Sequence, residues 1–296
     1  MEKILEINNL TKHYGRIKAV SNLNLEVEQG QVYGILGPNG SGKTTTLAII
    51  TGILRQNSGS FLWFGKEGDN PVLRRKIGSL IEGPSFYPYL NLSDNLRIIA
   101  GIKDSSPGNS DNALKITGLY KRRHSPYRTL SLGMKQRLAL ASILLSDPEV
   151  MVLDEPANGL DPEGIAEVRE IILNEAHKGK TIILASHILA EVEKVCTHAL
   201  ILKEGELLAC GRVDQLLGGK QVYLVAAGNI RKLEELLQSW GNVESVSSVS
   251  DGLIVTCSGS TTPADLNRYA FDHDFVLTKL LPVKKSLESQ FLELVK

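Results

Sequence analysis

The sequence predicts an α/β fold built on a largely parallel sheet. Strand-like and helix-like stretches alternate along most of the chain, and several of the strand-like stretches are apolar at every position. Short, continuous apolar runs are typical of strands that are buried on both faces of a parallel sheet. A chain of 296 residues is long enough for one large domain of this kind and a smaller second one.

The elements of the larger domain follow from their residue patterns. Residues 1–7 alternate polar and apolar side chains like a strand, and short apolar runs predict further strands at residues 32–36, 79–81, 150–153 and 181–185. Apolar residues at helical spacing predict a helix that begins at Lys43 and others over residues 94–101, 111–119, 132–145 and 162–177. Strands separated by helical sequence are what the crossover connections of a parallel sheet require.

A domain boundary is predicted at Gly218-Gly219, directly after a helix-like stretch at residues 213–217. Beyond this boundary the pattern predicts strands at residues 221–225, 243–249, 253–257 and 275–281. It also predicts helices over residues 231–240, 264–271 and 286–295. We therefore expect one domain over residues 1–218 and a small α+β accessory domain over residues 219–296, with a core of its own.

Charge and composition exclude several classes of protein. The 33 Lys and Arg residues balance 33 Asp and Glu residues, which excludes a broadly basic nucleic-acid-binding protein. No apolar run in the sequence approaches the roughly 18–20 residues of a membrane-spanning helix, and the first residues lack the order of a signal peptide. Three widely spaced cysteines are typical of reduced thiols, so we expect a cytoplasmic protein that does not cross a membrane by itself.

A glycine-rich stretch between an apolar strand and a helix predicts a phosphate-binding loop. It matches the pattern G-x-x-x-x-G-K-[ST], and we assign to this site Gly37, Pro38, Asn39, Gly40, Ser41, Gly42, Lys43, Thr44 and Thr45. Glycines let backbone N–H groups turn toward phosphates, and the start of the following helix adds partial positive charge. We expect Lys43 to reach the β- and γ-phosphates of a nucleoside triphosphate and Thr44 to offer its hydroxyl to Mg²⁺.

Two acidic residues follow the buried strand at residues 150–153. Groups just past the carboxyl end of a parallel strand face the ligand crevice. Asp154 can therefore hold Mg²⁺, and Glu155 can polarise the attacking water as a general base. Taken alone, such a pair is equally well explained as the N-cap of a helix. Beside a phosphate loop, the metal and the base are the favoured roles.

The start of a later helix indicates the class of nucleotide-binding protein. Ser131 and Gly133 lie where a capping serine and free backbone N–H groups favour an anion, although an N-capped core helix is the alternative. Residues 130–137, LSLGMKQR, resemble the signature sequence of ABC-type ATPases. The resemblance implies that the signature of one subunit closes on the ATP held by the other. Two MgATP are then enclosed in a dimer of identical or different ATPase subunits.

Other motifs of the ABC family follow in order over residues 2–217. Tyr14 matches the aromatic residue that stacks on adenine, residues 158–161 match the loop that links the two active sites, and His187 matches the histidine that contacts the γ-phosphate. The resemblance implies a P-loop NTPase of the ABC ATPase type, with a parallel-sheet core, an antiparallel β subdomain and a helical subdomain at about residues 83–148. It also implies ATP hydrolysis coupled to transport.

Glu82 departs from the family pattern, which usually has a glutamine at this place. A carboxylate beside Mg²⁺ and a triphosphate can bind the metal or repel the phosphates. We assign Glu82 to the metal site with Thr44 and Asp154, and a neutral substitution is the alternative. Leu132 and Met134 are further departures, because the signature usually has glycine and glutamine there.

The stretch around Glu82 narrows the resemblance to one branch of the family. Residues 81–90, IEGPSFYPYL, resemble the ATPase subunits of bacitracin-resistance and lantibiotic-immunity exporters. This implies export of a cationic or cyclic peptide antibiotic through a separate polytopic membrane permease, with the chain peripheral on the inner face of the cell membrane. Phe86, Tyr87 and Tyr89 either form an exposed edge that receives a cytoplasmic helix of the permease or pack in the core.

The alternative function is that of a soluble, non-transport ABC ATPase acting on a nucleic-acid or protein assembly. Members of that kind carry long coiled coils between the phosphate loop and the signature, or two ATPase cassettes in one chain, and this sequence has neither. A nucleotide kinase would have no use for the Ser131 helix or for the loop at residues 158–161. We therefore expect no nucleic-acid partner.

Overall fold

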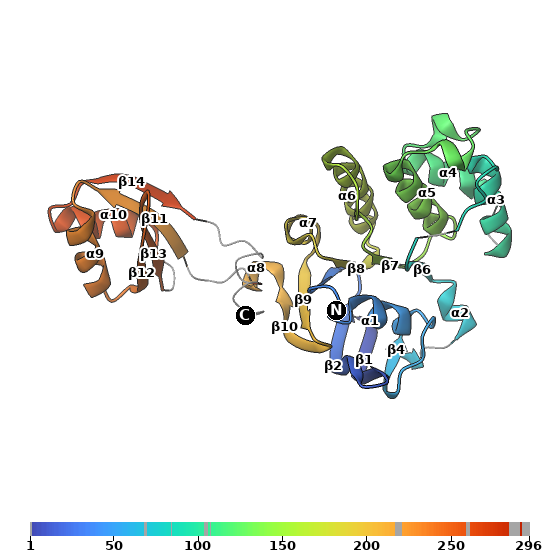
Figure 1. Ribbon diagram of the computed structural model, residues 1–296, viewed down its shortest axis with the longest axis horizontal. Helices are drawn as coiled ribbons and strands as arrows, with labels where there is room; N and C mark the ends of the chain where they lie inside the picture. Colours follow the sequence, from blue (N-terminus) through green and yellow to red (C-terminus); the bar gives the residue numbers. More distant parts are fainter. Residues whose placement is uncertain are drawn as a thin grey trace. The chain divides into compact units, whose positions relative to one another are not determined.

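The structure is a computed structural model that describes residues 2–67, 70–83, 85–103, 106, 108–216, 221–258, 261–283 and 291. The chain forms two compact units, the first over Met1–Val213 and the second beginning at Asp214 (Figure 1). The predicted boundary at Gly218-Gly219 and nearly all of the helix predicted over residues 286–295 lie outside the described residues. No helix among the described residues is long and apolar enough to span a membrane.

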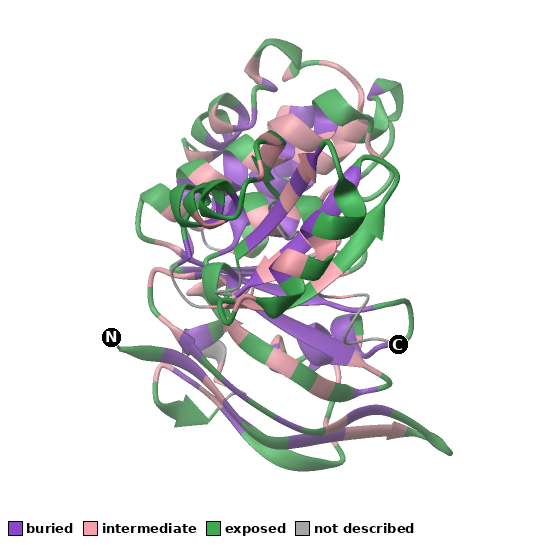
Figure 2. Cartoon of the chain, turned by 90° about the vertical axis from the view of Figure 1, so that its left-hand side faces the viewer, coloured by how far each residue is buried: buried purple, intermediate pink, exposed green. Residues whose placement is uncertain are grey.

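The first unit is centred on a six-stranded sheet with the strand order β10-β9-β3-β8-β7-β6. Its strands are β3 (Val32–Leu36), β6 (Ile77–Leu80), β7 (Val150–Asp154), β8 (Thr181–Ser186), β9 (His198–Lys203) and β10 (Glu206–Arg212). All neighbouring strands pair in parallel except β10, which pairs antiparallel with β9 at the edge. Nearly every residue of β3, β7 and β8 is buried, which confirms the predicted parallel core. Figure 2 colours the described residues of the whole chain by burial, with buried residues in purple and exposed residues in green.

A second sheet of the first unit is antiparallel, with the order β2-β1-β4-β5. It contains β1 (Lys3–Tyr14), β2 (Ile17–Glu28), β4 (Ser58–Trp63) and β5 (Lys66–Glu67). β1 and β2 form a hairpin in which Tyr14 pairs with Ile17. Helix α1 (Lys43–Ile50) shares one apolar core with both sheets, and the buried indole of Trp63 donates a 2.7 Å hydrogen bond to the carbonyl of Ile50.

The remaining elements of the first unit are helical. They are α2 (Pro71–Arg74), α3 (Leu92–Ile102), α4 (Asn109–Ile116), α5 (Leu132–Leu144), α6 (Pro162–His177), α7 (Leu189–Val195) and two 3₁₀ turns, Tyr120–Arg122 and Tyr127–Thr129. A further short helix, α8 (Val213–Leu216), begins at the last residue of this unit. Helix α4 ends earlier than predicted because Gly118, with φ 68°, turns the chain out of the helix. The predicted buried strands and long helices of this unit are otherwise present.

The second unit has the element order β11 (Gln221–Ala227), α9 (Ile230–Ser239), β12 (Val243–Val249), β13 (Gly252–Cys257), α10 (Pro263–Asp272) and β14 (Leu277–Pro282). The four strands form an antiparallel sheet with the order β12-β13-β11-β14. Leu233, Leu237 and Leu266 of the two helices are fully buried against the strands. The predicted strands and the two predicted helices within the described residues are present, and they enclose a core of their own.

Candidate functional site

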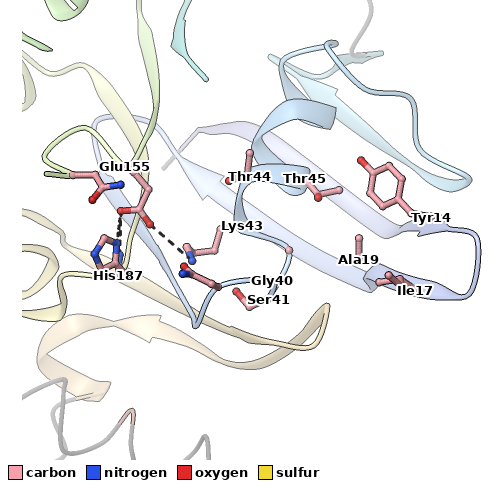
Figure 3. Close-up of a pocket in the computed structure, with 13 residues that line it drawn as sticks. Tyr14, Ile17, Ala19, Gly40, Ser41, Lys43, Thr44, Thr45, Glu155 and His187 are labelled. Atoms are coloured by element: carbon pink, nitrogen blue, oxygen red, sulfur yellow. Dashed lines mark hydrogen bonds and ion pairs between the residues drawn. The ribbon is translucent and has the colours of Figure 1, made fainter. Parts of the chain in front are cut away.

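A pocket of about 510 Å³ lies where the phosphate loop, the β1–β2 hairpin and the ends of β7 and β8 meet (Figure 3). Its lining includes most residues predicted for the site: Tyr14, Asn39, Gly40, Ser41, Gly42, Lys43, Thr44, Thr45, Glu155 and His187. Ile17, Ala19 and Asn158 complete the lining. Figure 3 shows Lys43, Glu155 and His187 at one end and Tyr14, Ile17 and Ala19 at the other. The pocket therefore has a charged end and an apolar end.

The loop between β3 and α1 curls around the Lys43 side chain. The Lys43 ammonium is buried and donates hydrogen bonds to the carbonyl oxygens of Gly37, at 2.8 Å, and Pro38, at 3.3 Å. Gly42 has φ 100°, and a Cβ atom built there would lie 2.2 Å from the carbonyl oxygen of Ala19, so only glycine fits. The buried hydroxyl of Ser41 has no hydrogen-bond partner within the described residues. Such a loop at a helix start is suited to bind phosphate.

Glu155 connects three segments at the charged end of the pocket. Its Oε2 lies 2.8 Å from Nδ1 of His187, and its Oε1 lies 3.9 Å from Nζ of Lys43. The backbone N–H of Glu155 donates to the carbonyl of Ala185 on the neighbouring strand, and the Glu155 carbonyl accepts from the N–H of Asn158. Glu155 adopts φ 47°, a left-handed conformation that the strand pattern does not predict. The carboxylate is thereby held in the pocket between a cation and an imidazole.

Asp154, the last residue of β7, is the half-buried acidic group beside the loop. Burial raises the pKa of Asp154 and the charges of Glu155 and Glu82 raise it further, while a hydrogen bond with Thr44 and the Lys43 charge lower it. Oδ1 of Asp154 is buried and has no hydrogen-bond partner in the described part of the chain. An unpaired carboxylate oxygen beside a hydroxyl fits a hard divalent cation, which prefers oxygen ligands.

Within the described residues, no group of three or more His, Cys, Asp or Glu side chains is placed to hold a metal ion. Mg²⁺ is commonly bound by one or two carboxylates together with substrate phosphates rather than by an all-protein cage. The oxygens of Thr44 and Asp154 therefore fit Mg²⁺ that arrives with a nucleotide, and they do not form a complete metal site by themselves.

Comparisons with known proteins give the family. The sequence profile of the ABC transporter family matches residues 20–158. The bacitracin transport ATP-binding protein BcrA of Bacillus licheniformis is 37% identical over 100% of this chain and 98% of its own length. The chain belongs to the ABC transporter family. It is an ATP-binding subunit that hydrolyses ATP, and the predicted P-loop fold of the ABC ATPase type is confirmed.

Two further relatives support this ABC ATPase assignment. The lantibiotic transport ATP-binding protein SrtF of Streptococcus pyogenes is 41% identical over 69% of this chain and 89% of its own length. The solved structure of CbiO1 from Clostridium perfringens is part of the ABC transporter complex CbiONQ. It is 30% identical to this chain, the match covers 73% of this chain and 91% of CbiO1, and the TM-score is 0.66. BcrA and SrtF confirm the predicted resemblance to the bacitracin and lantibiotic branch.

Not all residues predicted for the ABC ATPase site line the pocket. Ser131 caps α5 by accepting a 3.3 Å hydrogen bond from the N–H of Met134, and both Ser131 and the adjacent Leu132 are exposed. Gly133 lies near Leu160, on the loop that precedes α6. Gly37, Pro38, Glu82, Asp154, Ser131 and Gly133 are absent from the pocket lining. Ser131 is thus an N-cap, as the alternative interpretation of this residue predicts, and the start of α5 is open to solvent.

Glu82 follows β6, next to the end of β7, and its side chain is exposed. Like Glu155, it adopts a left-handed conformation, with φ 56°. Its negative charge is among the causes that raise the pKa of Asp154, so the two carboxylates interact. A substitution that removes the Glu82 charge therefore changes the electrostatic environment of Asp154.

The aromatic residues after Glu82 divide between the core and the exposed surface. Phe86 is buried and packs on Tyr127, with 5.1 Å between the ring centroids. Tyr87 and Tyr89 are 59% and 79% exposed, and Arg128 lies over the Tyr89 ring. The prediction of core packing is correct for the first aromatic residue, and the prediction of an exposed edge is correct for the other two.

Sequence reasoning missed Ile17 and Ala19 at the apolar end of the pocket. Both residues lie on or near the start of β2, whereas the predicted aromatic residue, Tyr14, ends β1. Ile17 is 69% exposed and pairs with Tyr14 across the hairpin. The signal that would have identified them is the hairpin itself, because directly opposite residues share one face of the sheet.

Proposed function

We propose that this subunit dimerises on two MgATP and drives a separate polytopic membrane permease that exports a peptide antibiotic of the bacitracin or lantibiotic type. The observation that carries the hydrolytic part is the Glu155 carboxylate, held between His187 and Lys43 at the charged end of the pocket. The antibiotic class is supported by the names of BcrA and SrtF, which are transport proteins for bacitracin and a lantibiotic.

In the proposed complex, ATP lies along the pocket with adenine at the apolar end and phosphates at the charged end. Tyr14 stacks on the base, since an aromatic ring offers a flat apolar surface to a purine. The backbone N–H groups of the loop at residues 37–45 and the start of α1 bind the phosphates. Lys43 exchanges its carbonyl partners for the β- and γ-phosphates, which are stronger acceptors because they are charged.

Thr44 and Asp154 are proposed to hold Mg²⁺, with Glu82 next to them as the third oxygen donor. When bound, Mg²⁺ neutralises charge on the β- and γ-phosphates. Support comes from the unpaired Oδ1 of Asp154 and from the Thr44–Asp154 hydrogen bond. The raised pKa of Asp154 is expected to return toward the usual range when a divalent cation lies beside the carboxylate.

Glu155 is proposed to orient the attacking water and accept its proton. His187 contacts the Glu155 carboxylate at 2.8 Å and lies at the same end of the pocket, where it is proposed to contact the γ-phosphate. A general base must lie within hydrogen-bond reach of the proton that it takes, either directly or through one water. The carboxylate at the charged end of the pocket is suited to that requirement once ATP is bound.

The proposed dimer explains why Ser131 and Gly133 are outside the pocket of their own chain. A capped helix start that is open to solvent can bind the γ-phosphate held by a second subunit. The second subunit is either identical or a different ATPase subunit. In the same proposal, exposed Tyr87 and Tyr89 receive a cytoplasmic helix of the permease, and the chain is peripheral on the inner face of the membrane.

Antibiotic survival tests this proposal. A strain that lacks the gene is complemented with the unchanged chain, with Glu155→Gln, or with Glu235→Gln, a matched substitution at an exposed residue of α9. The proposal expects the unchanged chain and Glu235→Gln to restore growth in bacitracin or a lantibiotic, and Glu155→Gln to fail. Equal survival of all strains, including the deletion, contradicts the export of such antibiotics and favours the non-transport alternative.

A further inference from the structure

The Tyr14 ring stands at the solvent edge of the pocket, where little packing holds it. It is 45% exposed and belongs to the last residue of β1, and its hairpin partner Ile17 is also exposed. Figure 3 shows the ring at the apolar end, away from Lys43. An exposed side chain loses rotamer freedom when it stacks on a ligand. Contacts that fix the ring before binding therefore strengthen the stack.

Lys12 supplies a contact of this kind. Its ammonium lies 5.3 Å from the centroid of the Tyr14 ring, within the distance of a cation–π interaction. The same ammonium donates a 2.6 Å hydrogen bond to the carbonyl oxygen of Arg55, in the segment that precedes β4. Lys12 is thus tethered at the tip of its side chain, unlike a freely solvated lysine.

The segment at residues 55–57, which binds the Lys12 ammonium, is itself hydrogen-bonded to β1. The backbone N–H of His13 donates a 2.7 Å hydrogen bond to Oδ1 of Asn57, and the backbone N–H of Asn57 donates a 2.9 Å bond to the carbonyl of Thr11. The pairing of β1 with β2 shifts register on both sides of Lys12. Such irregularities re-aim side chains near functional sites. Here the strand end and the Arg55 carbonyl together fix the ammonium beside the Tyr14 ring.

We infer that Lys12 is a positioning residue for the adenine base of ATP. Its tethered ammonium covers one face of the Tyr14 ring and leaves the other face to stack on the base. This inference rests on the proposed role of Tyr14. Lys12 acts through the ring, so it strengthens binding of adenine nucleotides and leaves binding of a bare polyphosphate unchanged.

The test compares Lys12→Met, which keeps the length of the aliphatic stem and removes the charge, with Lys12→Arg, which keeps a cation. Each change is made in the full chain and in a Tyr14→Ala background, with Lys3→Met at the far end of β1 as the control. Dissociation constants are measured by calorimetry for ADP, for a non-hydrolysable ATP analogue and for inorganic tripolyphosphate. Thermal unfolding midpoints verify that each variant is folded.

Lys12→Met is expected to weaken the binding of both adenine nucleotides by about two- to fivefold, which corresponds to the free energy of an exposed cation–π interaction. Tripolyphosphate binding is expected to stay constant, Lys12→Arg to restore nucleotide affinity, and Lys12→Met to have no further effect in the Tyr14→Ala background. Weakening that persists in that background overturns the inference, because Lys12 then contacts the nucleotide itself.

Two other outcomes are also decisive. Unchanged or tighter nucleotide binding by Lys12→Met, while Tyr14→Ala weakens it, refutes the inference and leaves the proposed adenine site intact. Unchanged nucleotide binding by Tyr14→Ala refutes both the role of Lys12 and the proposed role of Tyr14, because the ring then has no part in holding the base.

Discussion

Replacement of Glu155 by glutamine probes the chemistry of the pocket with a small change in shape. In the unchanged chain the Glu155 carboxylate lies 2.8 Å from Nδ1 of His187. The amide of the glutamine keeps the size of the side chain and one oxygen for this contact, but it cannot accept a proton from water. Loss of a general base costs about 100- to 10,000-fold in rate. We expect the turnover number for ATP to fall by that amount.

The same substitution removes a charge that competes with the γ-phosphate for Lys43. The Lys43–Glu155 distance is 3.9 Å, and at an effective dielectric constant of about 20 such a pair attracts by about 4 kcal/mol before desolvation is counted. The carboxylate also repels the phosphates. ATP affinity is therefore expected to be retained or increased in Glu155→Gln, and the ATP-bound dimer to persist.

The assay measures phosphate release at saturating ATP and Mg²⁺, together with ATP binding at equilibrium, for the unchanged chain, Glu155→Gln and His187→Ala. Because the two residues act as a unit, the double variant should be little slower than Glu155→Gln alone. Turnover by Glu155→Gln within about tenfold of the unchanged chain would remove this residue from the role of base. A fall in turnover that comes only from lost ATP binding would assign it a binding role instead.

Three further predictions test other parts of the structure. Gly42→Ala should lower the free energy of unfolding in urea more than Gly40→Ala does. Both glycines have positive φ, which costs alanine roughly 1–2 kcal/mol, but only at Gly42 would the added Cβ atom collide with a backbone atom. Equal losses of unfolding free energy in the two variants would contradict this reasoning. Glu82→Gln should change the MgATP dissociation constant by less than about tenfold, because the amide keeps one oxygen for Mg²⁺ and the charge that is lost is exposed to solvent. A larger loss in equilibrium titrations would show that the Glu82 charge is essential to the metal site. Thr262→Ala should destabilise the second unit by about 1 kcal/mol through loss of the capping box. The Thr262 hydrogen bonds lower the pKa of Asp265, so the contribution of the bonds to its carboxylate is present above the ordinary value of 3.8 and is lost as the pH falls through the lowered pKa. The bond from the Asp265 N–H to the Thr262 hydroxyl does not titrate, so the urea-unfolding difference should shrink at lower pH, and an undiminished difference would contradict this cause.

Much of the parallel core could be predicted because its signals are local. The apolar run at residues 32–36 coincides with β3, and the run at residues 150–153 lies within β7. Strands β2, β9 and β10 were not predicted. β2 and β10 mix buried or half-buried residues with exposed ones. Residues 199–202 of β9 and 207–210 of β10 are continuous apolar runs, so these two strands carried a local signal that was overlooked. In β2 the alternating Leu23, Leu25 and Val27 carried a readable signal of period two.

The candidate site divides in the same way. The phosphate loop is contiguous in sequence, so its pattern predicts its residues, whereas Ile17 and Ala19 enter the pocket only because β2 folds back on β1. Burial of Phe86 depends on Tyr127, which is remote in sequence, so residue type alone could not separate it from the exposed Tyr87. The left-handed backbone of Glu155 likewise depends on its place between strands.

We propose that this ATPase drives a separate membrane permease. The most direct measurement is co-purification of the tagged chain from native membranes in mild detergent, with mass-spectrometric identification of its partners. We predict recovery of a polytopic membrane protein that lacks an ATPase cassette of its own, in a complex with two ATPase subunits. Recovery only from the soluble fraction, bound to nucleic acid or to a soluble protein assembly, would contradict the claim.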